Sequence, residues 1–169
     1  SFMPHELVSV KLALSPHTRL ATDRSQFEQQ MIALTHTFEF AASHRLHSDR
    51  LSDDENRALF GKCNNVHGHG HNYVVEVTVA GTPDDHGVLL PIDTLEQIVD
   101  ERVISPMDHR HLNVEVDEFA GDKLNPSVEN IAKVCYDRLH DAIGEAGASL
   151  DAVRVWETPK TWCEYRRDG

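Results

Sequence analysis

The stretch from His69 to Ala80, HGHNYVVEVTVA, constrains the fold more than any other part of the chain. Side chains two apart on a β-strand point to the same face of the sheet. The odd-numbered positions carry apolar side chains, and this alternation predicts a strand over 71–80 with one apolar face. These positions are Tyr73, Val75, Val77 and Val79.

Histidines begin this strand. Because His69 and His71 are two apart, their imidazoles point the same way and can bind one metal ion, and Gly70 between them removes bulk. A catalytic zinc ion needs about three protein ligands and an open position. We expect His44, in FAASHRL at the end of the preceding predicted strand, to be the third ligand. The competing interpretation is a chance cluster in a chain with 12 histidines.

The number of metal ligands depends on how two neighbouring residues, His67 and Cys63, are interpreted. His67 has the same parity, but it follows the Asn64-Asn65 turn, and we predict that it is not a ligand. Cys63 is either a fourth ligand, which would close a structural zinc site, or a thiol that transfers protons. Its third interpretation is a small buried apolar side chain, which also fits Cys135 and Cys163.

Charge and cysteine content argue against several classes of protein. The chain has 16 basic and 28 acidic residues among 169, which disfavours nucleic-acid binding. An anionic substrate would need a local basic patch to offset this net charge of −12. Three cysteines argue against a disulfide framework and for a reducing compartment, and no apolar stretch could span a bilayer. The sequence therefore predicts a cytoplasmic protein.

The remaining elements follow from capping and periodicity. We expect strands near 35–40, 151–158 and 161–166, with a turn at Pro159. Capping boxes predict helices after Ser52 and after Asp93, the latter ended by Pro106. A third helix is expected to open at Asn125-Pro126. Its predicted buried stripe is Val128, Ile131, Cys135, Leu139 and Ala142 or Ile143.

This order of elements predicts an α+β domain with an antiparallel sheet over residues 31–169. Residues 3–30 are expected to be an N-terminal extension, either an added edge strand (7–14 alternates weakly) or a loosely held arm. Ser1-Phe2 ahead of Met3 is expected to be a cloning scar.

Polar residues at two further positions are candidates for chemistry. Asp108 precedes His109, and a carboxylate beside an imidazole can orient it for proton transfer. Glu157 ends a predicted strand, where its carboxylate can accept two hydrogen bonds from an amidine-like ring edge. The plainer interpretations are a capping turn and a solvated glutamate.

Taken together, the motifs resemble a known family. FEFAASHRL, LSDDENRALFGKCNNVHGHGHNY, MDHRHLN, PSVENIA and VWET occur in this order. The series resembles 6-pyruvoyl-tetrahydropterin synthase. The resemblance implies a tunnelling fold (T-fold), with a four-stranded antiparallel sheet and two long helices on one face. It also implies trimers that close into a β-barrel, and two trimers stacked as a homo-hexamer.

The resemblance also implies roles. Zn²⁺ would be held by His44, His69 and His71, Cys63 would be the acid–base thiol, and Asp108 and His109 a proton-transfer pair. Glu157 would anchor the amino-pyrimidine edge of the pterin. Ser127 and Glu129 would contact it too, although Ser127 and Val128 stand where the family often has Thr.

The implied reaction converts 7,8-dihydroneopterin triphosphate, with elimination of triphosphate and without an external redox cofactor. Arg45 and Lys62 flank the motif and are candidate triphosphate contacts. Two rivals remain. 6-Carboxy-tetrahydropterin synthase of the queuosine pathway typically has three residues between Cys and His, whereas Asn64 to Gly68 makes five here. A zinc-binding module without turnover would use Cys63 as a fourth ligand.

Overall fold

The computed structural model describes residues 9–13, 18–23, 31–121 and 123–167. Its strands form one sheet in the order β1-β2-β3-β4-β6-β7, with β5 paired to β3. The strands are β1 (Ser9–Ala13), β2 (Thr18–Asp23), β3 (Ile32–His44), β4 (His69–Gly81), β5 (Arg110–His111), β6 (Ser149–Thr158) and β7 (Thr161–Tyr165). The helices are α2 (Asp53–Phe60), α3 (Ile92–Val99), α4 (Ser105–Met107), α5 (Leu112–Glu115) and α6 (Val128–Glu145), with a 3₁₀-helix η1 (Gly61–Asn64) and a π-helix η2 (Asp100–Ile104).

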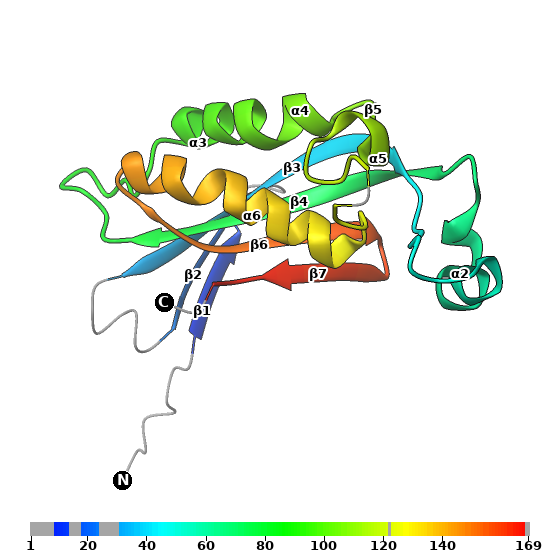
Figure 1. Cartoon of the computed structure of the whole chain (residues 1–169). Coiled ribbons are helices and arrows are strands. Elements are labelled where there is room, and N and C mark those ends of the chain that lie inside the picture. The colour runs from blue at the N-terminus through cyan, green and yellow to red at the C-terminus, as the bar shows by residue number, and fades with distance from the viewer. Residues whose placement is uncertain (1–8, 14–17, 24–30, 122, 168–169) are drawn as a thin grey trace, which may run out of the picture.

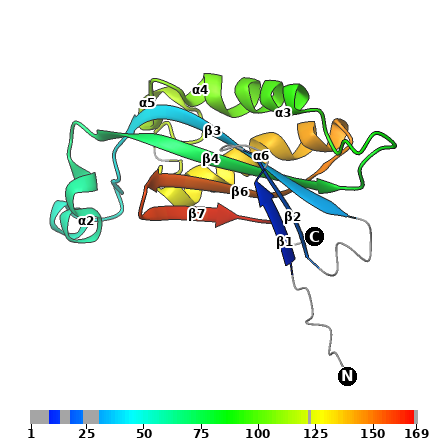
Figure 2. The same cartoon turned by 180° about the vertical axis from the view of Figure 1, so that it is seen from behind.

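Helices cover one face of this sheet. Figures 1 and 2 show the helical run from α3 to α4 beside α6 on one face, and none of the described helices covers the opposite face. Two long helical segments on one face were expected. The short helix α2 projects beyond the sheet, between the end of β3 and the start of β4 (Figure 1).

The apolar residues predicted from the alternation in β4 lie in the hydrophobic core. All four odd-numbered apolar residues of β4 are fully buried, and the predicted stripe of α6 is buried too, with Ile143 rather than Ala142 as its last member. Leu95, Val99 and Val103 complete the layer from α3 and η2. The periodicities of 2 and 3.6 residues therefore identified the apolar faces correctly.

The expectation of a four-stranded sheet is wrong. The expected strands, β3, β4, β6 and β7, do lie side by side, but β5 adds a fifth strand within residues 31–169. Two more, β1 and β2, form a hairpin on β3, with Ala33 to His36 pairing with β2. The N-terminal segment thus contributes edge strands, one of its two predicted forms, and the domain boundary at residue 31 stays a prediction.

Three predicted helix ends also differ from the structure. The box at Asp93 does not form, because the helix starts at Ile92, two residues before the predicted start, with Pro91 as its N-cap. Pro106 does not end the second helical segment, since it lies inside α4, which continues directly from η2 to Met107. Ser127, rather than Asn125-Pro126, caps α6. The capping box of Ser52 and Glu55 is confirmed.

No helix in the described part of the chain is both long and apolar enough to cross a bilayer.

Candidate metal centre and adjoining cleft

The antiparallel pairing of β3 with β4 brings the three predicted histidines together. His44, the last residue of β3, pairs with His69, and Ala42 pairs with His71. One ring nitrogen from each imidazole lies within 4.8 Å of the others, and the Nε2 atoms of His44 and His69 are 3.2 Å apart. Three nitrogen donors at this separation can hold one metal ion.

Hydrogen bonding fixes the ring of His44. Its Nδ1 lies 2.7 Å from the carbonyl oxygen of Pro126, which can only accept, so Nδ1 carries the proton and Nε2 presents a lone pair to the other two rings. The side chain is fully buried. Burial, with the neighbouring imidazoles of His69, His71 and His111, lowers the pKa of His44 to about 4 despite the bond to Pro126. The ring is therefore neutral at neutral pH, as a metal ligand must be.

Buried nitrogens without a partner support a cation at this point. Among the described residues, Nδ1 of His69 and Nε2 of His71 are buried and accept or donate no hydrogen bond. Burying such atoms unsatisfied costs free energy. For His71, a metal ion in the middle of the cluster would remove that cost, so the residues present fit the ion that the sequence predicts.

Gly68 is a requirement of the site that the sequence interpretation missed. Its φ is +70°, and a Cβ there would lie 2.7 Å from the backbone oxygen of His44. Any side chain would strain the turn and push β3 and β4 apart at the cluster. The sequence did contain an indication of this requirement. A glycine directly before His69 is typical of a backbone conformation that other residues rarely adopt.

His111 is a second residue near the cluster that the sequence analysis did not identify. It follows Asp108-His109 in the motif MDHRHLN. Its Nε2 would contact a Cβ at Gly68, and its Nδ1 is buried without a partner among the described residues. It therefore borders the cluster, but it is not one of the three residues whose nitrogens meet.

The two uncertain residues of the motif lie outside the cluster. His67 is exposed, and its backbone N–H donates to Asn65 Oδ1 in the turn. Cys63 lies in η1, half-buried, and its sulfur is not among the atoms grouped around the possible ion. Burial and the nearby charge of Glu157 raise the pKa of the Cys63 thiol, and a cation bound at the histidines would act in the opposite direction.

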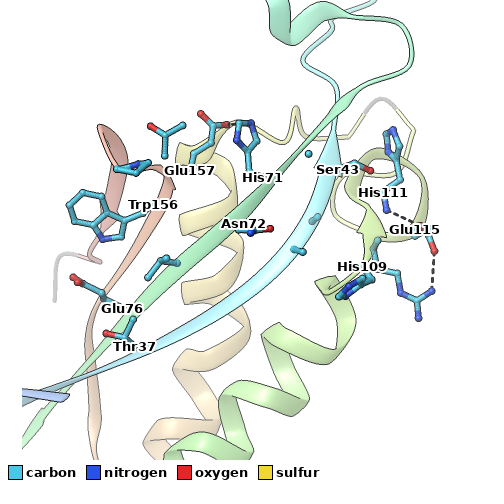
Figure 3. Close-up of a pocket in the computed structure, with 17 residues that line it drawn as sticks. Thr37, Ser43, His71, Asn72, Glu76, His109, His111, Glu115, Trp156 and Glu157 are labelled. Atoms are coloured by element: carbon cyan, nitrogen blue, oxygen red, sulfur yellow. Dashed lines mark hydrogen bonds and ion pairs between the residues drawn. The ribbon is translucent and has the colours of Figure 1, made fainter. Parts of the chain in front are cut away.

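A cleft opens beside the cluster, and Figure 3 shows its walls. His71 and Glu157 lie together at one side of it, while His109 lies apart from them beyond β3 and β4 (Figure 3). Glu157 Oε1 is 3.5 Å from Nε2 of His44 and 3.7 Å from Nε2 of His71. Glu157 therefore borders both the histidines and the cleft.

Asp108 and His109 form a rigid pair. Asp108 Oδ1 accepts the backbone N–H of Ala41 at 2.8 Å, and its Oδ2 lies 2.7 Å from His109 Nδ1. These bonds, the one from Ala41 first, lower the pKa of Asp108. The backbone N–H of His109 donates to Ala41 O, its φ is +56°, and 82% of its side chain is exposed. A strained backbone that presents an oriented imidazole to solvent is typical of a functional residue.

Ser127 and Glu129 do not line this cleft. Ser127 accepts a hydrogen bond from Asn130 N as the N-cap of α6, which holds the Pro126 carbonyl in place for His44. Glu129 is exposed in the first turn of the same helix. Cys135 is fully buried and Cys163 packs half-buried on the core, as expected for small apolar side chains, and all three cysteines are free.

Fold and site together define an α+β protein with a cluster of three histidines, able to hold a metal ion, at the end of an antiparallel sheet. The family model for 6-pyruvoyl tetrahydropterin synthase matches residues 33–168, and the chain belongs to this family of lyases. A 6-pyruvoyl tetrahydrobiopterin synthase of Drosophila melanogaster is 41% identical over 141 residues, 82% of each chain.

Two further comparisons agree with the family. The structure of Caenorhabditis elegans 6-pyruvoyl tetrahydropterin synthase superimposes with a TM-score of 0.75 at 34% identity, covering 82% of this chain and 96% of that one. A 6-carboxy-5,6,7,8-tetrahydropterin synthase of Haemophilus influenzae is 30% identical over 126 residues, 63% of this chain and 85% of the other.

The metal assignment predicts unequal effects of two neighbouring substitutions. His69→Ala should remove most of the bound zinc, because two histidines lack the ligand number for a stable site. His67→Ala, two residues away in the same motif, should leave the zinc content unchanged. Elemental analysis of the purified variants measures both. Full zinc in His69→Ala, or lost zinc in His67→Ala, would show that the wrong histidines were chosen.

Proposed function

We propose that this protein converts 7,8-dihydroneopterin triphosphate to 6-pyruvoyl-tetrahydropterin with elimination of triphosphate, as a zinc-dependent enzyme. The observation that carries the proposal is the meeting of three imidazole nitrogens beside Glu157, at the edge of a cleft that also contains His109. Relatives named 6-pyruvoyl tetrahydrobiopterin synthase support the type of reaction.

Zinc is the proposed ion because of the donor set. Three neutral imidazoles without a thiolate suit a catalytic zinc site, which keeps a coordination position open for substrate. When bound, the ion would act as a Lewis acid toward the hydroxyl groups of the substrate side chain. His44, His69 and His71 would hold it, and the Pro126 carbonyl would keep the His44 ring in the required tautomer.

Proton transfer is assigned to Asp108, His109 and Cys63. Asp108 Oδ2 lies against His109 Nδ1, so Nδ1 carries a proton and Nε2 is left to accept or donate one. His109 faces the cleft with most of its ring exposed, as a group that meets a bound substrate should. Cys63 would supply the second acid–base group, on the stretch between α2 and β4.

Glu157 is the proposed anchor of the pterin. Its Oε1 faces the histidines, and its Oε2 has no hydrogen-bond or ion-pair partner among the described residues. A carboxylate in this position can accept hydrogen bonds from the amino-pyrimidine edge of a ring in the cleft. Contacts from Ser127 and Glu129 stay predictions, and so does a cytoplasmic location.

Product analysis tests the reaction. We expect zinc-loaded protein to convert dihydroneopterin triphosphate to 6-pyruvoyl-tetrahydropterin and inorganic triphosphate, identified by chromatography and mass spectrometry. Release of acetaldehyde with a 6-carboxy pterin would instead assign the second reaction. The higher identity to the pyruvoyl relatives, 41% against 30%, and the five-residue spacing after Cys63 favour the first.

Cys63 separates an enzyme from a zinc-binding module. Cys63→Ala should lower turnover by about 10²–10⁴-fold, the usual contribution of a positioned proton-transfer group, while zinc stays bound. Zinc content and product formation are measured on the same preparation, with Cys163→Ala as the matched control. If metal is lost together with activity, Cys63 is a ligand; if activity is intact, the residue has no part in the mechanism.

Assembly as a homo-hexamer of two stacked trimers is part of the proposal. On the β3 edge, β2 pairs with Ala33 to His36 and β5 with Ala42 and Ser43, so the backbone of residues 37–40 lies between these partners without a strand. The outer side of β7 has no partner strand among the described residues either. Unpaired edges favour pairing between chains.

Sedimentation velocity tests the assembly. We expect a hexamer at micromolar concentration, with trimers as its dissociation product, because a closed ring can pair the open stretch of β3 with β7 of a neighbouring chain. A monomer under these conditions would contradict the proposal. The hairpin of β1 and β2 covers part of the β3 edge, so closure has to use the remaining part of that edge.

A further inference from the structure

A second pocket, distinct from the cleft, adjoins the histidine cluster. It is bounded by α2, η1, the residue that follows β3 and the turn before β4, and His69 forms part of its wall. It shares no residue with the cleft lined by His71 and Glu157. The histidine cluster therefore has one ligand facing each cavity.

The two cavities differ in charge. The cleft has three carboxylates, from Glu76, Glu115 and Glu157, and one arginine, Arg110, which is already paired with Glu115 at 3.0 Å. The second pocket has three cationic side chains and one acidic side chain, although the whole chain carries a charge of −12. These residues are Arg45, Arg57, Lys62 and Asp53. An anion would be repelled from the first cavity and attracted to the second.

The cationic side chains of this pocket differ in whether their charged atoms already have a partner. The backbone of Arg45 exchanges two hydrogen bonds with the side chain of Asn113, and its Nε donates to Asn64 O at 3.2 Å. In the part of the chain that the structure describes, its two terminal nitrogens and the Lys62 ammonium have no partner. Arg57 is less available, because it pairs with Asp54 at 2.8 Å. Arg45 and Lys62 are thus the free cations.

The segment that carries Lys62 is also fixed. Leu46 N donates to the carbonyl of Cys63 at 2.8 Å, and Asn64 Nδ2 donates to Leu46 O at 2.7 Å. These bonds tie η1 to the chain that follows β3. The backbone that carries Lys62 is therefore fixed, although its side chain is exposed, so binding a polyanion has to order that side chain but not the segment.

We propose that Arg45 and Lys62 bind the triphosphate of the substrate in this pocket, a role that rests on the proposed function. In dihydroneopterin triphosphate, the carbon that bears the triphosphate is bonded directly to a hydroxyl-bearing carbon of the side chain. With the hydroxyls at the histidine cluster and the ring in the acidic cleft, the phosphates must enter a cavity that touches the cluster. The pocket beside His69 meets this condition.

This placement also gives the pocket a part in the reaction. In the elimination, a base removes the proton on the neighbouring hydroxyl-bearing carbon, and a double bond forms between that carbon and the last side-chain carbon. The bond from the last side-chain carbon to the ester oxygen breaks, and its electron pair stays on the triphosphate, whose negative charge increases. Cations fixed where charge develops favour that step. An arginine suits the role, since its terminal nitrogens can contact two phosphate oxygens at once, while Lys62 acts as a point charge.

Binding of inorganic tripolyphosphate to the zinc-loaded protein tests the proposal without turnover. Lys62→Gln and Arg45→Gln should each weaken binding by about tenfold or more, the effect of losing one charged hydrogen bond. Arg45→Lys should restore part of the affinity, because a cation remains. Arg110→Gln, which removes the arginine of the cleft, should leave the affinity unchanged. Because tripolyphosphate also binds metal ions, the zinc content is measured after each calorimetric titration.

Several results would overturn the assignment: no binding to the unsubstituted protein, unchanged affinity in Lys62→Gln and Arg45→Gln, or an equal loss in Arg110→Gln. Steady-state kinetics separates this failure from failure of the proposed function. If Lys62→Gln converts dihydroneopterin triphosphate with the same KM as the unsubstituted protein, the triphosphate site is rejected and the proposed function stands. If tripolyphosphate binding depends on Lys62 but the unsubstituted protein does not convert dihydroneopterin triphosphate, the proposed function is rejected and an anion-binding site remains.

Discussion

The register between β3 and β4 is the constraint on which the candidate site depends. In this register His44 stands opposite His69, and Ala42 stands opposite His71. Because side chains alternate between faces, a slip of one residue would turn the histidines of one strand to the other side. The same pairing buries Tyr73 and Val75 against the helices, so the free energy of apolar burial holds the register and thereby the metal ligands.

Around this pair of strands, other elements supply what the histidines need. The turn before α6 provides the Pro126 carbonyl for His44, and Ser127 fixes that turn by capping the helix. The left-handed Gly68 lets the backbone pass close to His44. The segment after β3 holds η1 and its basic residue Lys62 in place through Leu46. Each of these supports involves at least one backbone group.

The secondary structure was largely predictable, and the errors have identifiable causes. The alternation in β4 and the stripe of α6 reflect burial, which is strongly patterned in sequence. The box at Asp93 failed because Pro91 starts the helix earlier, so Asp93 lies in the first turn rather than at the cap. The sheet is larger than expected because the hairpin of β1 and β2 and the two-residue β5 pair with β3, and pairing partners leave little trace in local sequence.

The sequence by itself identified the three histidines that meet, the strands that carry two of the contacts between them and, through its motifs, the family, because spacing, periodicity and motifs are local properties of the chain. It also identified Arg45 and Lys62 as basic residues flanking the motif. Only the tertiary structure decided that they line a pocket separate from the cleft that contains Glu157, and that this cleft is acidic. The reason is physical: electrostatic potential and cavity shape arise from residues far apart in the chain, which only folding brings together.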